Sequence, residues 1–226
     1  METADNLTAV TENAASARSA LYRWLAASFA FPTPEFHACV CDGEYFASMA
    51  QLMARLPYAF DPELIQTLEL SLGGLASGFD DFSAEYTRLF DVGREGGRPP
   101  CPLYGGEYSG RSRLDVMEEL VRFYRFFDLG LSERDRELPD HVTVELEFLH
   151  YLTFREDRTL EAAGDPSSYR RAQRDFIERH PGAWIPILRQ SLEKQTPIPF
   201  FAGLIALTSE VLDADIAYLR TALSPR

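Results

Sequence analysis

The residues with the most chemical potential gather in one stretch, Pro139 to Leu152. His141 and Glu145 lie four residues apart there, and Asp140 directly precedes them. No proline or glycine follows until Gly164, so the stretch predicts one long helix that begins at its first two residues. An imidazole and a carboxylate one helical turn apart can satisfy each other, ligate a metal or meet a bound ligand.

The surroundings of this pair make it costly. At about 100° per residue, the apolar side chains of the helix fill one wide arc, and His141 and Glu145 fall inside it. Polar groups amid Leu, Val and Phe need partners. Two interpretations remain open. The pattern alone favours a pair satisfied inside a helical core; in the other, the pair and Asp140 face a groove and meet a ligand.

Enzyme and metal signatures are weak in this chain. Glu147-Phe148-Leu149-His150 matches the Glu-x-x-His element of di-iron bundles, but a second copy is missing, so we interpret the match as accidental. There is no Gly-rich phosphate loop, no Gly-x-Ser-x-Gly and no paired-cysteine zinc motif. We predict a non-enzyme without a cofactor. The alternative is a metal-binding or enzymatic helical protein that uses the His141/Glu145 face.

Composition narrows the class of protein and of partner. The chain has 226 residues, of which 46% are hydrophobic and 12% aromatic, which indicates a folded protein. A net charge of −13 argues against nucleic-acid binding and suits a basic partner, although acidity also simply confers solubility. The odd count of three cysteines, the acidic N-terminus and the lack of a long apolar run predict a cytoplasmic protein.

Prolines, glycines and caps divide the chain into predicted helices, and no alternating strand pattern is present. We predict an all-α, bundle-like single domain over residues 13–226, with roughly nine helices and a disordered segment at 1–12. Gly130 is predicted to cap the helix before it. The expected helices are residues 14–29, 34–55 with a break at 41–43, 61–72, 80–91, 112–129, 139–163, 165–179, 184–195, and a last helix that begins at Pro197 or Pro199 and runs to Leu219.

One long irregular segment interrupts this pattern. Val92 to Gly110 holds six glycines and three prolines, and a loop of this length is usually functional or mobile. Its Tyr104 and Tyr108 are aromatic side chains suited to contact a partner. The segment is equally a candidate hinge between two helical halves.

Four segments, in this order, resemble the TorD/DmsD/NarJ family of redox-enzyme maturation chaperones. They are Glu85-Tyr86-Thr87-Arg88-Leu89-Phe90, Cys101-Pro102-Leu103-Tyr104 with Tyr108, Pro139-Asp140-His141 with Glu145-Leu146-Glu147-Phe148-Leu149, and Phe176-Ile177-Glu178-Arg179-His180 before Trp184. The sequences of residues 101–108 and 117–124 most resemble those of the branch that serves type II enzymes of the dimethyl sulfoxide reductase family. That branch includes chaperones for ethylbenzene and dimethyl sulfide dehydrogenases and for selenate and chlorate reductases.

The resemblance implies an all-helical cytoplasmic chaperone without catalysis of its own. Such proteins bind a molybdenum-containing catalytic subunit, often through its twin-arginine leader. They delay its export until the molybdopterin guanine dinucleotide cofactor is inserted. Guanine nucleotide binding, suggested in relatives, lacks a phosphate-binding loop here. The chain is expected to be a monomer or a domain-swapped dimer.

In the family, the Asp-His pair and the loop before it are implicated in leader binding. Here these are Asp140 and His141, with Tyr104 and Tyr108 in the loop. Gly105-Gly106 departs from relatives that carry Glu-Ser. The other candidate client-binding residues are Glu145, Glu85, Tyr86 and Arg88.

The physics of a basic leader is compatible with this site. Asp140 and Glu145 could offer carboxylates to its arginines. The acidic chain should speed encounter with the leader, and His141 would make binding sensitive to pH.

Overall fold

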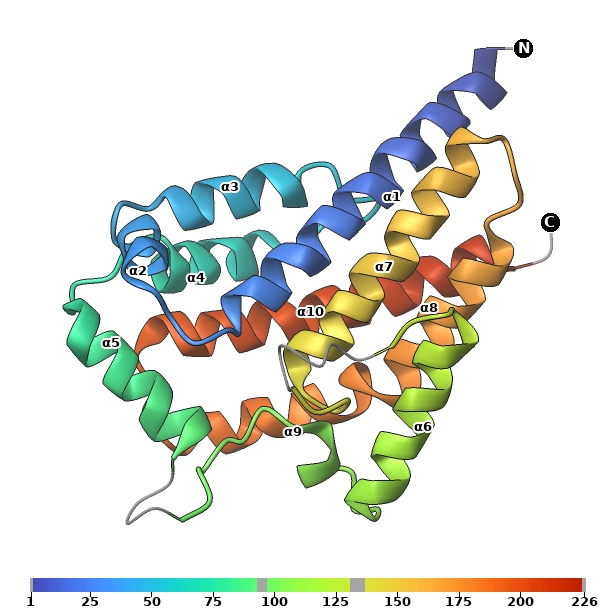
Figure 1. Cartoon of the computed structure of the whole chain (residues 1–226). Helices are drawn as coiled ribbons and strands as arrows, with labels where there is room; N and C mark the ends of the chain where they lie inside the picture. The colour runs from blue at the N-terminus through green and yellow to red at the C-terminus, as the bar shows by residue number, and fades with distance from the viewer. Residues whose placement is uncertain (1, 93–96, 131–136, 225–226) are drawn as a thin grey trace.

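Ten helices, α1 to α10 in Figure 1, build the fold over the residues that the computed structural model describes, which are 2–92, 97–130 and 137–224. They are α1 (Glu2–Ser28), α2 (Pro34–Cys41), α3 (Glu44–Met53), α4 (Pro62–Leu72), α5 (Phe79–Tyr86), α6 (Arg113–Phe126), α7 (Val142–Glu161), α8 (Ser167–Arg179), α9 (Pro181–Glu193) and α10 (Pro199–Ala222). A π-helical turn, Thr87–Asp91, continues α5, and a 3-10 turn, Gly105–Glu107, lies in the long loop. Strands are absent from these ranges, which confirms the all-α prediction.

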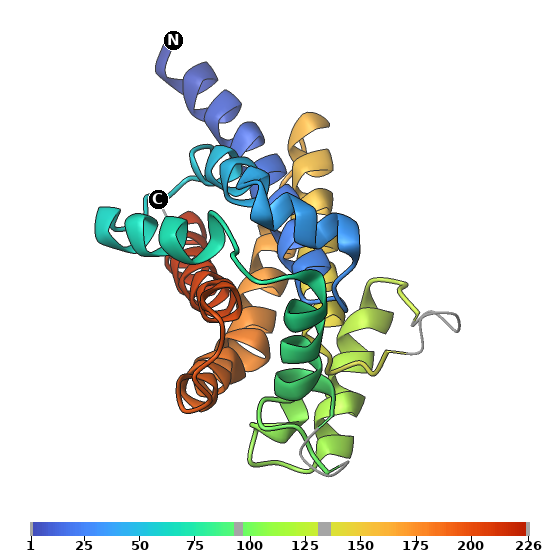
Figure 2. The same cartoon turned by 90° about the vertical axis from the view of Figure 1, so that its left-hand side faces the viewer.

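The longest helices form the frame of the molecule. α1 runs alongside α7, and α10 crosses behind them to pack against α4, α8 and α9 (Figure 1). α2, α3 and α4 group at one side, which faces the viewer in Figure 2. α6 and the loop before it stand beside the first turns of α7. None of the helices in the described ranges is both long and apolar enough to span a membrane.

Local sequence signals explain most helix starts. The side chains of Thr33 and Asp61 accept hydrogen bonds from the first turns of α2 and α4, and a proline follows each. The predicted break after Cys41 is real. Gly43 takes a positive φ of 75° there, and its Cα so closely faces the Gly73 carbonyl that a Cβ would lie 2.8 Å from the oxygen.

Several boundaries differ from the sequence expectation. α7 begins at Val142 rather than at Pro139, because the side chain of His141 caps it. α6 ends early, and Asp128 with φ 57° takes the left-handed position expected of Gly130. α9 starts at Pro181, so Pro186 lies inside it.

The N-terminal segment also differs from expectation. The backbone of residues 2–12 continues α1, where the sequence analysis expects disorder. This stretch contains neither proline nor glycine, so nothing in it forces the helix to end.

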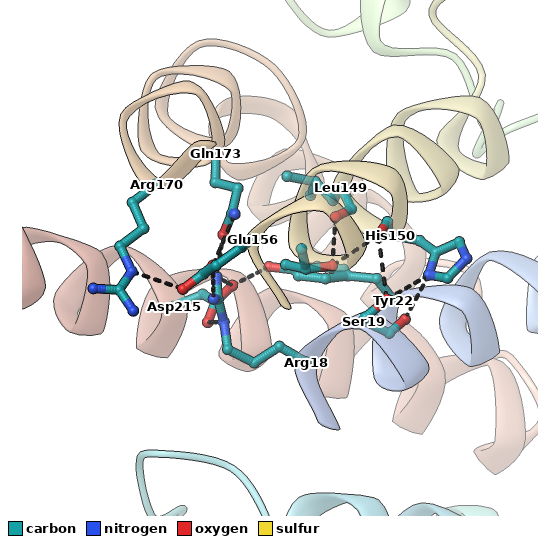
Figure 3. A network of polar contacts seen from close by, with 10 residues as sticks. Arg18, Ser19, Tyr22, Leu149, His150, Glu156, Arg170, Gln173 and Asp215 are labelled. Atoms are coloured by element: carbon teal, nitrogen blue, oxygen red, sulfur yellow. Dashed lines mark hydrogen bonds and ion pairs between the residues drawn. The ribbon is translucent and has the colours of Figure 1, made fainter. Parts of the chain in front are cut away.

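A largely buried ionic cluster joins the long helices (Figure 3). Arg18 of α1 donates to Asp215 of α10 at 2.7 and 2.8 Å and to Glu156 of α7 at 2.8 Å. Arg170 and Gln173 of α8 bind the same Glu156 at 2.7 and 2.9 Å. Two guanidiniums face two carboxylates, so the cluster is electrically balanced.

Candidate functional site

The long loop is hydrogen-bonded to the segment that leads into α7. The backbone N–H of Gly105 donates to the Asp140 carbonyl at 2.7 Å, and that of Val142 donates to the Leu103 carbonyl at 2.9 Å. Tyr104 and His141 thereby form an isolated antiparallel bridge. Residues 35 to 39 positions apart in sequence thus meet at the mouth of α7.

The side chain of Asp140 holds the turn of this loop at Gly106. Its side chain is buried, and Oδ2 accepts hydrogen bonds from the Gly106 N–H and from Arg113 Nε, each at 3.1 Å. A Cβ on Gly106 would lie 2.8 Å from Oδ2 and 2.6 Å from Cγ of Arg113. The glycine is therefore required for this close approach. The sequence analysis expects Asp140 to pair with an arginine of a leader, whereas in the structure it pairs with Arg113 of the same chain.

His141 caps α7 with its imidazole. Nδ1 accepts a hydrogen bond from the Thr143 N–H at 3.3 Å and lies 2.7 Å from Thr143 Oγ1. The ring packs edge-on against Tyr104, with centroids 4.9 Å apart. Burial lowers the pKa of His141 to about 4, although Asp140 opposes the shift. The imidazole is therefore neutral at pH 7, so any pH sensitivity that it confers lies well below neutrality.

Glu145 lies beneath the loop, fully buried. Its Oε2 accepts a hydrogen bond from Trp184 Nε1 at 2.9 Å, while Oε1 has no hydrogen-bond partner within the described ranges. Burial raises the pKa of Glu145 well above its ordinary value, and the bond from Trp184 only partly offsets this. A Cβ on Gly105 would lie 2.7 Å from Nε1 and 3.1 Å from Oε1, so Gly105 allows the loop to cover this pair.

Tyr108 completes the packing around that pair. Its ring stacks on Trp184, with centroids 5.6 Å apart and planes at 9°. Its hydroxyl donates to the Pro102 carbonyl at 2.9 Å. In this structure Tyr108 therefore shapes the loop from inside, whereas Tyr104 faces the cavity described next.

The residues of the Glu-Tyr-Thr-Arg segment divide between two places. Glu85 and Arg88 bind each other at 2.6 and 2.8 Å, and Arg88 also donates to the Gln195 carbonyl at 3.2 Å. This pair ties α5 to the start of α10, away from Asp140. Tyr86 donates to the Phe29 carbonyl at 2.7 Å and reaches the cavity.

A cavity of about 490 Å³, here called the acidic cavity, brings together Tyr86, Tyr104 and His141. Arg113 lies over the Tyr104 ring, 4.6 Å from its centroid. The other charged groups that line it are Asp91, Arg98, Glu107 and Glu137. With Asp140 beneath, four carboxylates face two guanidiniums, which leaves two negative charges in excess. Arg98 and Arg113 both bind Glu107, so the cavity lacks an unpaired cation among its described lining.

A second cavity of about 430 Å³, here called the apolar cavity, adjoins the first. The two share Ala30, Glu137 and Thr143. The second lies between the end of α1 and the first half of α7, and its surface is mainly carbon. Its other lining residues include Ala26, Tyr124, Leu129, Val144, Phe148 and Tyr151.

Of the predicted site residues, Tyr86, Tyr104 and His141 line the acidic cavity, but the exposed charges that line it were not among the predictions. Asp140 and Glu145, the two carboxylates expected to face a ligand, are both buried. The carboxylates that line the cavity are Asp91, Glu107 and Glu137. Asp91 and Glu137 flank the family-like segments, and Glu107 lies inside one, but none of the three was predicted as a site residue. No cluster of three or more His, Cys, Asp or Glu side chains suited to a metal occurs in the described ranges. Residues 131–136, just before Glu137, lie outside those ranges.

Three comparisons relate this chain to known proteins. The family model described as nitrate reductase delta subunit matches residues 57–190. A perchlorate reductase assembly chaperone protein from Dechloromonas aromatica (strain RCB) is 34% identical over 205 residues, 88% of each chain. A selenate reductase assembly chaperone protein from Thauera selenatis is 44% identical over 115 residues, 50% of this chain and 58% of the relative.

Similarity extends to more distant sequences and to the fold. A dimethyl sulfide dehydrogenase assembly chaperone protein from Rhodovulum sulfidophilum is 28% identical over 221 residues, 93% of this chain and 84% of the relative. A crystal structure from Archaeoglobus fulgidus, described as a redox enzyme maturation protein, aligns with a TM-score of 0.50 at 20% identity. It covers 87% of this chain and 93% of that one, and it supports the fold alone.

Proposed function

This chain belongs to the TorD/DmsD/NarJ family of redox-enzyme maturation chaperones, and from that premise we propose that it is a system-specific chaperone for one molybdenum-containing catalytic subunit of the dimethyl sulfoxide reductase family. It acts in the cytoplasm, assists insertion of the cofactor and delays export until insertion is complete. The relatives' names describe chaperones and not enzymes, in agreement with the sequence prediction. They do not favour the alternative of a metal protein or enzyme on the His141/Glu145 face.

We propose that the acidic cavity and the apolar cavity bind the twin-arginine leader of that subunit. The observation that carries the proposal is their adjacency. A leader has a basic start followed by an apolar middle. The acidic cavity has two carboxylates in excess, enough to match two arginines, and it opens onto a carbon-lined hollow.

Within this proposal the predicted residues act in two ways. Tyr86 and Tyr104 contact the leader directly, while Asp91 and Glu137 supply charge. Asp140 and His141 act by position: Asp140 holds Gly106 and Arg113, and Arg113 in turn lies over Tyr104. Glu145 and Tyr108 support the loop through Trp184. Glu85 and Arg88 act further away, by fixing α5.

A calorimetric titration tests the leader site. The probe is a leader peptide with two arginines, and its matched control carries two lysines. We expect the lysine peptide to bind about tenfold more weakly, because lysine lacks the fork that pairs with carboxylates. Glu137→Gln and Asp91→Asn should each weaken the arginine peptide about three- to fivefold, as expected for partly exposed charges.

Two further variants locate the effect. Asp140→Asn should weaken binding through the released loop, while Glu69→Gln, which removes an exposed carboxylate on α4, should leave the affinity unchanged. Equal loss with Glu69→Gln would mean that only the overall charge matters. Equal affinity for the arginine and lysine peptides, or no binding of either, would contradict the proposal.

A further inference from the structure

A third and larger hollow lies beyond the apolar cavity, between α6, α7 and α8. Its volume is about 1000 Å³. Phe127, Tyr151 and Tyr169 form an aromatic floor, with the Phe127 ring 6.0 Å from that of Tyr169 and 6.4 Å from that of Tyr151. Phe126 stands on the rim and is 81% exposed, the most exposed large hydrophobic side chain in the described ranges. A phenylalanine held in water at the edge of a hollow indicates a contact surface.

Arginines distinguish this hollow from the rest of an acidic surface. Arg155 lies over the rings of Tyr151 and Tyr169, at 5.9 and 5.5 Å, and makes no ion pair within the described ranges. Arg171 makes neither a hydrogen bond nor an ion pair there. Arg122 is a third guanidinium, 3.4 Å from the exposed Glu118.

Two carboxylates, Asp128 and Asp175, also line this hollow. Asp175 is neutralised by Arg174 at 2.7 Å. Arg155, over the aromatic floor, and Arg171, on the lining, therefore make no ion pair in the described ranges, in a chain whose net charge is −13. We call this surface the aromatic–arginine hollow.

The hollow is continuous with the proposed leader site. It shares Leu129 and Tyr151 with the apolar cavity, which in turn shares three residues with the acidic cavity. From Thr143 to Arg155 the helix α7 rises by roughly 18 Å, at about 1.5 Å per residue. A helical apolar stretch of about 12 residues has the same length, and leaders carry apolar stretches of about 7–15 residues.

The orientation of a bound leader along the cavities follows from the order of its basic and apolar parts. Because the basic start precedes the apolar middle, a leader that lies in the two cavities points its C-terminal end toward Arg155. Whatever follows the apolar middle then meets guanidiniums and aromatic rings. Carboxylates and an aromatic or large apolar side chain are the groups that this surface complements.

We propose that the aromatic–arginine hollow binds an acidic, aromatic-containing segment of the client that directly follows the apolar part of its leader. This inference rests on the proposed function and extends it beyond the leader. The chaperone then reads the leader and the first residues of the body as one continuous segment. The acidic cavity and the aromatic–arginine hollow carry charges of opposite sign, and this fixes the direction in which the segment lies across them.

The test uses three labelled peptides that share a twin-arginine start and a twelve-residue apolar middle. One ends there, one continues as Gly-Asp-Phe-Glu-Asp, and one continues as Gly-Asn-Phe-Gln-Asn. Fluorescence anisotropy gives their affinities for the intact protein. We expect the acidic peptide to bind about tenfold tighter than the amide peptide. The double variant Arg155→Gln/Arg171→Gln should remove that difference and leave the short peptide unaffected.

Matched control variants distinguish the loss of contacts in the hollow from the general loss of an exposed arginine or apolar side chain. Arg171→Gln is compared with Arg55→Gln, which removes an exposed arginine between α3 and α4. Phe126→Ser is compared with Leu70→Ser, since Leu70 is 79% exposed on α4. We expect Phe126→Ser to weaken both extended peptides about threefold and Leu70→Ser to weaken neither.

The outcomes distinguish this inference from the proposed function. If the short peptide binds but the acidic extension adds nothing, the inference is wrong and the leader site stands. If the short peptide does not bind at all, the leader site itself fails. Arg171-dependent binding of guanosine triphosphate or of vesicles with 30% phosphatidylglycerol, without an effect of the acidic extension, would reassign the hollow. A dimer that dissociates on Phe126→Ser would do the same.

Discussion

Buried charged groups occur in two regions of this molecule, between the long helices and at the mouth of α7. The two regions differ in whether positive and negative charges cancel. Between the long helices, Arg18 and Arg170 meet Glu156 and Asp215, and each carboxylate has at least two partners (Figure 3). At the mouth of α7, carboxylates outnumber guanidiniums. Nearby lies Glu145, a buried carboxyl group with one oxygen that has no partner in the described ranges.

The difference separates two uses of buried charge. Opposite charges that neutralise each other hold helices in one arrangement and need nothing from outside. An excess of one sign, next to a cavity, costs stability that a ligand of the other sign can return. The pKa values follow the same division. Burial opposes ionisation of Glu156, but Arg18 and Arg170 outweigh it and lower its pKa, whereas burial raises that of Glu145.

Removal of the central cation should have the largest effect on stability. Arg18→Met leaves Glu156 and Asp215 buried with one guanidinium fewer. We expect a loss of about 3–5 kcal/mol in the free energy of unfolding, as for other broken buried pairs. For a chain of this size that loss lowers Tm by roughly 10 °C. Thermal unfolding followed by circular dichroism measures it.

The control for Arg18 lies on the same helix. Arg23 is exposed on α1, so Arg23→Met should change Tm by less than about 2 °C. If Arg18→Met behaves like Arg23→Met, the cluster does not hold the helices together and the contrast between the two regions fails.

Mild acid should lower stability through two buried histidines, His141 in the site and His180 between α8 and α9, rather than through the balanced cluster. Burial lowers the pKa values of His141 and His180 to about 4, so both imidazoles are neutral in the fold near pH 6. The unfolded chain protonates them near pH 6.5 and binds more protons, so stability falls as pH drops from about 6.5 toward 4. Each histidine contributes about 2–3 kcal/mol to that loss at the lower end.

Urea unfolding at pH 7.5, 6 and 5 measures this dependence. His141→Asn should match the wild type at pH 7.5, because asparagine is also a good N-cap, and should lose less stability by pH 5. Glu145, whose pKa burial raises, changes the stability in the opposite direction over this range, but it is present in both proteins and its effect cancels in the comparison. If the free energy of unfolding of His141→Asn falls with pH as steeply as that of the wild type, His141 is not buried as described.

The sequence predicted helices better than it predicted side-chain partners. Prolines and capping residues are local signals, so the α2, α4 and α10 starts followed from them. The cap by His141 depends on where its ring turns after the loop has docked, so the pattern instead suggested a helix from Pro139. The position of Gly130 suggested a cap that Asp128 in fact supplies, because the chain turns two residues earlier.

The site shows the same limit more sharply. Family-like segments pointed to the loop and the mouth of α7, and they predicted Asp140, His141 and Tyr104 as site residues. They could not show that Asp140 binds Arg113 of the same chain, or that Trp184, 39 residues from Glu145, covers it. Such partners depend on tertiary packing between helices, which spacing along the chain does not encode.

The smallest expected effect is the sharpest test of the contrast, because the same substitution should act oppositely in the two regions. Glu145→Gln keeps an oxygen for Trp184 Nε1 and removes a buried group that resists ionisation. Since the pKa of Glu145 is raised in the fold, the wild type loses stability as pH rises above about 4.5, and the variant does not. At pH 8 we therefore expect the free energy of unfolding of Glu145→Gln to equal that of the wild type or to exceed it by up to about 1 kcal/mol.

The matching substitution in the balanced cluster is Glu156→Gln. It should lower the free energy of unfolding by about 2–3 kcal/mol, because it leaves Arg18 and Arg170 short of a carboxylate. Urea unfolding of both variants at pH 6 and 8 measures the two effects side by side. Equal losses at both positions would mean that the carboxyl group at the mouth of α7 is stabilised like the one in the core, and the contrast between the two regions would then fail.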